Sequence, residues 1–259
     1  KTKDGFYAAA SGIYNFISGP ILYGRVMTYE RIEIMAKRFK VDPANGSYLF
    51  FNSQNFGQDP AAFNSLWSSA YKTIFYSNML MDNISRHEGV LTKDESDILR
   101  GEMLTIRAFL HFDMLRLFGP RWENNAATLS IPYNEKAVAE RLPLLPFETV
   151  ITKIIKDLDE AETLLTKDPV ITQGPMASAP TDGQSIQLRF RQFRFNYYST
   201  IALKARVYLY AGKKPEALAT AKRLLADPKV HQHFPPVDAS KLLANQVDPD
   251  RVFSSEVLT

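Results

Sequence analysis

The segment GEMLTIRAFLHFDMLRLFGP, residues 101–120, is apolar on two sides when its residues are placed about 100° apart around a helix. One apolar row consists of Met103, Ile106, Leu110, Met114 and Leu117, and the second, roughly opposite, of Leu104, Ala108, Phe112 and Leu115. A helix with two apolar faces has to bury both of them against neighbours. The segment is therefore predicted to be an inner helix in a stacked array of helix hairpins, in which each hairpin buries its faces against the next.

Helical periodicity continues along most of the chain and predicts an all-α protein with long irregular loops. The predicted helices span residues 4–17, 21–39, 61–87, 94–118, 147–166, 195–211 and 215–226. The intervening loops are 40–60, 119–146 and 167–194. Capping residues support these limits, because Thr92 or Asp94 can begin the fourth helix and Gly119-Pro120 can end it. Pro215 suits the first turn of the last helix.

A tetratricopeptide-like signature lies in the last two predicted helices, STIALKARVYLYAGKKPEALATAKRLLADP. Ala205, Tyr208 and Ala217 have the small, aromatic and small spacing of that repeat, and Pro228 lies one residue short of its terminal proline. The third and fourth predicted helices follow the same hairpin pattern in a different register. These patterns predict about four helix pairs in a tetratricopeptide-like array.

Composition excludes several classes of site. The chain has no cysteine, so disulfides, thiolate nucleophiles and cysteine-ligated zinc or iron–sulfur sites are excluded. The net charge is +3, and no run of lysine and arginine is long enough for a nucleic-acid surface. Charged residues interrupt every apolar stretch well before the roughly 20 residues that span a bilayer. The first residues, KTKDGFYAAASGIYNF, lack the pattern of a signal peptide, so none is expected within the chain.

Four segments carry packing motifs in a characteristic order and spacing. They are LWSSAYKTIFYSNMLMDNI at 66–84, the segment 101–120, LPFETVITKIIKDLDEAETLL at 145–165 and RFNYYSTIALKARVYLYAGKKPEALATAKRLL at 194–225. The signature positions are Trp67, Tyr71, Arg107, Ala108, Phe112, Gly119, Asp157, Ala205 and Tyr208. On these residues the chain resembles the SusD/RagB family, mainly its helical, tetratricopeptide-like half.

The resemblance implies a function for the chain. Members of this family are outer-membrane lipoproteins of Bacteroidetes that bind glycans or other nutrients at the cell surface and act as a lid on a TonB-dependent transporter. By resemblance we expect a non-enzymatic protein without a cofactor, with a glycan or other nutrient as its ligand and such a transporter as its partner. Nucleic acid is not expected as a partner. Contact with the membrane is expected through a lipid anchor that is not present in this chain.

Two departures from the family pattern bear on the extent of the chain. The lipid-bearing cysteine near the mature N-terminus is missing, and the sequence stops where a large loop-rich C-terminal half normally begins. We therefore expect residues 1–259 to form a single but incomplete helical domain, either a fragment or an unusually short member. Because the second half commonly supplies much of the ligand site, the resemblance implies that residues 1–259 hold only part of that site.

Aromatic residues in two loops are the candidates for ligand contact. Trp122 lies in an insertion after the inner helix, where its indole could stack on a sugar ring, or could fold back on the helix end. The loop GSYLFFNSQNF, residues 46–56, has more aromatic side chains than a solvated loop needs, so some are expected to be buried. The predicted contact residues are Trp122, Tyr48, Phe51, Phe56 and Tyr133.

Three other patterns have a chemical interpretation and a structural one. LRFRQFRF at 188–195 alternates arginine and phenylalanine as a single-strand nucleic-acid groove does. The preferred interpretation is a loop whose aromatics dock on the sixth predicted helix, 195–211, while its arginines pair with acids. His231 and His233 could ligate a metal only with a third ligand nearby, and no metal site is expected. The acidic residues of 157–162 suggest paired glycosidase carboxylates, although consecutive helical positions point in different directions.

Two functions compete with nutrient capture. A helical-repeat scaffold that binds a peptide or protein in its concave groove is the first alternative, because repeat folds often do this. A helical glycan-cleaving enzyme is a weaker one. No catalytic residue is assigned.

Overall fold

The computed structural model describes residues 2–123, 125–178, 186–243, 249–250 and 252–258. Over this part of the chain the regular structure is helical, without strands, which confirms the predicted all-α class. Contacts within the chain separate two compact units. Unit 1 comprises Lys1–Asp82 and Asn134–Arg141, and unit 2 comprises Asn83–Tyr133 and Leu142–Thr259. The single domain expected over the whole chain stays a prediction.

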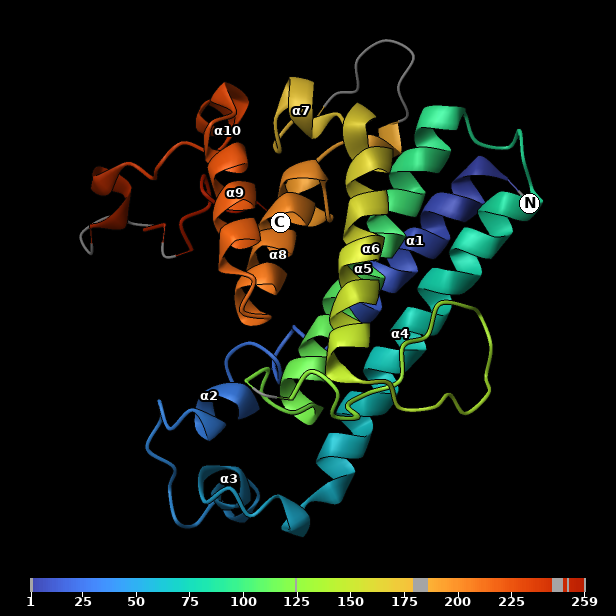
Figure 1. Ribbon diagram of the computed structural model, residues 1–259. Helices are drawn as coiled ribbons and strands as arrows, with labels where there is room; N and C mark the ends of the chain where they lie inside the picture. The colour runs from blue at the N-terminus through green and yellow to red at the C-terminus, as the bar shows by residue number, and fades with distance from the viewer. Residues whose placement is uncertain (1, 124, 179–185, 244–248, 251, 259) are drawn as a thin grey trace. The chain divides into compact units, whose positions relative to one another are not determined.

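The main helices of unit 1 are α1 (Lys3–Ile17) and most of α4 (Pro60–Arg86), which run side by side in Figure 1. Thr2 caps α1 by accepting a hydrogen bond from the backbone N–H of Gly5. The two helices meet at the stacked rings of Phe16 and Tyr76, whose centroids are 5.3 Å apart. The buried side of α1 consists of Phe6, Tyr7, Ala10, Ile13 and Ile17.

Residues 21–39 do not form the single helix that their periodicity predicted. The chain runs through consecutive turns before a short helix, α2 (Arg31–Met35). A Cβ on Gly24 would lie 2.2 Å from the carbonyl oxygen of Ser18, so the backbone is wound too tightly here for a side chain at this position. Because this compact loop also buries apolar residues such as Leu22, its pattern imitates that of an amphipathic helix.

The predicted loop 40–60 also differs, because it contains the helix α3 (Gly46–Asn52) and a 3-10 turn, Phe56–Gln58. α3 packs against α2. The aromatic residues of 46–56 contribute to this contact, because Phe51 is buried with Ile34 of α2 in a small core.

Unit 2 is built from consecutive packed helices. They are α5 (Lys93–Phe118), α6 (Phe147–Leu164), α8 (Tyr197–Tyr210) and α9 (Lys214–Leu225), with the short α7 (Val170–Gln173) and α10 (Pro228–His233) after α6 and α9. α5 packs on α6, α6 on α8, and α8 on α9, as Figure 1 shows. This pairwise packing agrees with the predicted tetratricopeptide-like array.

The inner helix α5 is buried along most of its length, as its two apolar rows predicted. Every member of both rows is buried except Leu117, which is half-buried near the C-terminal end. The helix begins with a capping box in which the Thr92 hydroxyl accepts from the backbone N–H of Glu95, while the Glu95 carboxylate accepts from that of Thr92. It ends at Gly119, as predicted.

Candidate ligand-binding surfaces

Two signature residues of unit 2, Arg107 and Asp157, belong to a buried polar network. The Arg107 guanidinium donates two hydrogen bonds to Asp157, and the Tyr133 hydroxyl donates a third, each 2.6 Å long. The His111 ring stacks on Tyr133 with centroids 3.9 Å apart, and its Nδ1 donates to the Arg107 carbonyl oxygen. Burial lowers the pKa of His111 to about 3, so the imidazole is neutral at physiological pH. This network joins α5 to α6 and to the segment that ends at Tyr133.

Two of the predicted contact residues are buried. Tyr133 is 5% exposed, and its hydroxyl is engaged with Asp157. Phe51 is 2% exposed, and the Arg31 guanidinium covers its ring at 5.1 Å from the centroid. In these positions both side chains contribute to packing, and neither presents a face on which a sugar could stack.

Tyr48 and Phe56 lie at the edge of the small core of unit 1. Tyr48 is partly buried beside that core, and Phe56 is exposed on one side. The Phe56 ring meets Phe63 of α4 edge to face, with centroids 5.4 Å apart. The loop therefore leaves part of its aromatic surface accessible within unit 1.

Trp122 folds back onto unit 2 and remains 40% exposed. Its indole lies against Gly212 in the turn between α8 and α9, where a Cβ on the glycine would be 2.6 Å from Cζ3 of the indole. Gly212 has a φ of +72°, a conformation that glycine adopts without strain. The side chain thus rests on the α8–α9 turn, and part of the residue faces solvent.

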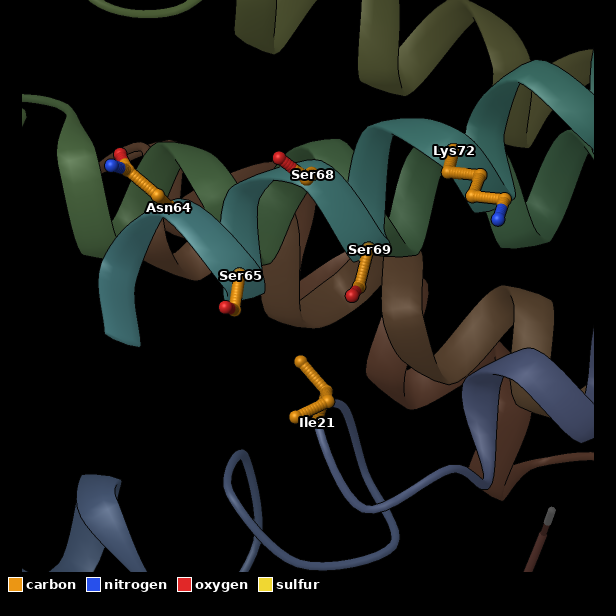
Figure 2. Close-up of a pocket in the computed structure, with 6 residues that line it drawn as sticks. All are labelled: Ile21, Asn64, Ser65, Ser68, Ser69 and Lys72. Atoms are coloured by element: carbon orange, nitrogen blue, oxygen red, sulfur yellow. The ribbon is translucent and has the colours of Figure 1, made fainter. Parts of the chain in front are cut away.

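Unit 1 contains a polar groove that the sequence patterns did not single out. It has a volume of about 470 Å³ and is lined by Ile21, Asn64, Ser65, Ser68, Ser69 and Lys72. In Figure 2, Ser65 and Ser69 point from α4 toward Ile21, which lies on the loop after α1. Ser65, Ser69 and Lys72 are spaced so that they lie along one side of a helix. This spacing is the sequence pattern from which the polar lining of the groove could have been predicted.

The arginine-rich stretch 188–195 is a structural element. Arg191 is buried, with Nη1 2.5 Å from a Glu102 oxygen and with Nε and Nη2 at 2.9 and 2.8 Å from the oxygens of Asp168. Phe195 packs on Phe109 of α5. The preferred interpretation, arginines paired with acids, is confirmed for Arg191.

The remaining polar motifs are engaged in packing and surface contacts. His231 Nε2 lies 2.9 Å from the Leu225 carbonyl oxygen, and His233 Nε2 lies 3.3 Å from that of Ile171. Among the described residues no group of three or more metal-ligating side chains occurs. In the acidic run, Asp157 pairs with Arg107, and Glu162 pairs with Lys204 and Arg223. These contacts show what the candidate metal and glycosidase side chains bind within the described residues.

A membrane-spanning helix is also absent from the described part of the chain, where none is both long and apolar enough. The described residues thus form a helical protein with stacked hairpins, a groove and partly exposed aromatic side chains.

A family comparison identifies the class more closely. Residues 23–180 match the model of a SusD-like family described as "Starch-binding associating with outer membrane". This match covers more than half of the chain, so the chain belongs to the SusD-like family. The resemblance drawn from the packing motifs is thereby confirmed. A search of curated proteins found no match.

Solved structures share the fold. A SusD superfamily protein from Bacteroides thetaiotaomicron is 21% identical with a TM-score of 0.69, over 88% of this chain and 46% of that one. A SusD-like carbohydrate binding protein from Bacteroides vulgatus is 16% identical with a TM-score of 0.67, over 93% and 47%. A laminarin binding SusD-like protein is 18% identical with a TM-score of 0.58, over 88% and 44%. The chain thus spans about half the length of these relatives.

Proposed function

We propose that the protein captures a glycan or other nutrient at the outer surface of the cell and delivers it to a TonB-dependent transporter in the outer membrane. The observation that carries this proposal is the family match over residues 23–180, because its description names starch binding and association with the outer membrane. Capture uses shape, stacking and hydrogen bonds, with no covalent step and no cofactor. A lipid anchor outside this chain holds the protein at the membrane.

The solved relatives support a glycan as the ligand. One is named a carbohydrate binding protein and another a laminarin binding protein. At the α5–α6 contact, the buried Asp157 carboxylate accepts from Arg107 and Tyr133, and His111 bonds the Arg107 carbonyl oxygen.

Trp122 is the proposed stacking residue of unit 2. Its indole packs against Gly212, and the residue is 40% exposed. An indole that is held in place and partly accessible suits stacking on a sugar ring. Tyr48 and Phe56 are proposed as secondary contacts of unit 1, since both lie at the edge of the loop core.

Exposed leucines on α9 are proposed as part of the transporter contact. Leu218 and Leu225 lie seven residues apart, so they share one side of the helix, and both are exposed. Apolar side chains exposed on one side of a helix are candidates for a protein–protein contact when they join a larger apolar patch. The same observation favours the alternative of a helical-repeat scaffold, whose partner would be a protein other than a transporter.

The proposal is tested with the whole natural protein by measuring glycan affinity and by purifying it from detergent-solubilised outer membrane. We expect binding to at least one neutral glycan, a loss of affinity in Trp122→Ala, and recovery of a TonB-dependent transporter. Phe193→Ala is the matched control, because Phe193 is also an exposed aromatic residue of unit 2. Recovery of a different protein without a transporter would favour the scaffold instead.

A further inference from the structure

We propose that the groove between α4 and the loop after α1 binds an acidic sugar, with a uronate carboxylate on Lys72 and sugar hydroxyls on the serines. The choice of a sugar as the ligand rests on the proposed function, in which the captured nutrient is a glycan. The site itself involves other residues than Trp122, and it lies wholly within unit 1.

The polar groups of the groove are available to a ligand. Elsewhere on α4 hydroxyls are tied to the backbone, as Thr73 and Ser77 donate to carbonyl oxygens one turn earlier. In the described part of unit 1, the hydroxyls of Ser65 and Ser69 have no such partner. Figure 2 shows both directed toward Ile21, so they face the space that a ligand would fill. Hydroxyls can donate to and accept from a sugar at once.

Lys72 gives the groove its preference for a negative charge. Within the described residues of unit 1, no carboxylate lies at ion-pair distance from its ammonium. The ammonium is instead held 5.4 Å from the centroid of Phe16 and 5.9 Å from that of Tyr76. Cation–π contacts orient a cation without neutralising it, so the charge remains free to bind an anion.

An aromatic surface adjoins this cation. Phe16 and Tyr76 stack with an interplanar angle of 26°, and Phe16 is 46% exposed. A partly exposed aromatic side chain beside hydroxyls and an ammonium offers an apolar contact, hydrogen bonds and a positive charge to one uronate residue.

The opposite wall of the groove is a tightly wound loop. Ile21 lies in the wound loop that requires Gly24, and the Tyr29 hydroxyl donates a hydrogen bond to the Gly24 carbonyl oxygen at 2.9 Å. Leu22, next to Ile21, is buried. A groove of about 470 Å³ between a helix and this loop lies within the size range of small-ligand sites.

The experiment is calorimetric titration of the purified protein with trimers of galacturonate, glucuronate and mannuronate and with their methyl esters, which keep the ring and lose the charge. We expect at least one acid trimer to bind about tenfold more tightly than its ester. Lys72→Met should remove this difference, and Ser65→Ala with Ser69→Ala should weaken both forms. Lys40→Met is the control, because Lys40 is an exposed lysine of unit 1 outside the groove.

Three outcomes would overturn the inference: equal affinity for acid and ester, an acid preference that survives Lys72→Met, or displacement of the trimer by an equal concentration of sulfate, which would show an anion site without sugar recognition. The result is separable from the proposed function. If neutral glycans fail to bind while a uronate trimer binds through Lys72, the proposal that Trp122 stacks on a glycan is rejected. The proposal for the groove then stands. If neutral glycans bind through Trp122 and no trimer distinguishes acid from ester, only the groove is rejected.

Discussion

Arg107 on α5 and Asp157 on α6 form a buried bidentate ion pair, in which Nε and Nη2 of the arginine each lie 2.6 Å from one carboxylate oxygen. Removing one partner leaves the other charge buried without compensation. We therefore expect Asp157→Asn to lower the free energy of unfolding by about 3–5 kcal/mol, measured by urea denaturation.

The control for this prediction is Asp159→Asn on the same helix. Asp159 is exposed and pairs with Lys204 at the surface, so its substitution should cost less than about 1 kcal/mol. Equal losses for the two variants would show that burial of the Arg107 pair does not matter to stability.

The packing of α5 predicts opposite defects at two neighbouring positions of its second apolar row. Ala108 and Phe112 are both fully buried, and Phe112 meets Tyr210 of α8 edge to face. Ala108→Leu should cost about 1–3 kcal/mol by overpacking. Phe112→Ala should cost about 3–5 kcal/mol by leaving a cavity. Thermal melts in which both variants matched the wild type would refute this two-sided packing.

The contact between Trp122 and Gly212 predicts a spectroscopic change. A methyl group at position 212 has no space beneath the indole, and a φ of +72° is strained for alanine. In a Trp67→Phe background, which leaves Trp122 as the single indole, Gly212→Ala should shift the fluorescence emission to longer wavelength and increase quenching by iodide. Lys214→Ala, two residues further along, is the control and should leave the spectrum unchanged.

Acid sensitivity is predicted from His111, whose pKa burial lowers to about 3. In the unfolded chain a histidine takes up a proton near pH 6.5, while the folded protein does not until about pH 3. Its contribution to stability is therefore complete above pH 6.5 and is lost as the pH falls through this window, by up to about 1.4 kcal/mol per pH unit. The difference between wild type and His111→Gln in urea denaturation should shrink from pH 7 to pH 4. A constant difference would contradict the prediction.

Periodicity predicted the helices of unit 2 well because each buries a continuous stripe or, in α5, two stripes. Periodicity gave a wrong helix over residues 21–39, because a loop wound around Gly24 buries apolar residues at similar spacing. The close approach of Gly24 to Ser18 distinguishes this loop from a helix, and it is visible only in the structure. Aromatic composition likewise could not separate Phe51, which is buried, from Phe56, which is partly exposed. The groove was missed because Ile21 and Lys72 are far apart in the sequence, and their proximity depends on that loop.

Arg191 has a consequence for how the family can diverge. Its guanidinium bonds Asp168, just after α6, and also the carbonyl oxygen of Phe195, just before α8, while Asp168 itself accepts from the backbone N–H of Tyr197. Both ends of the connection between the two helices are thus fastened at one point. The number of residues in between is not fixed by the packing of α6 on α8. Insertions and deletions among relatives should accumulate between positions 168 and 191, while the arginine and the acid that close this loop persist.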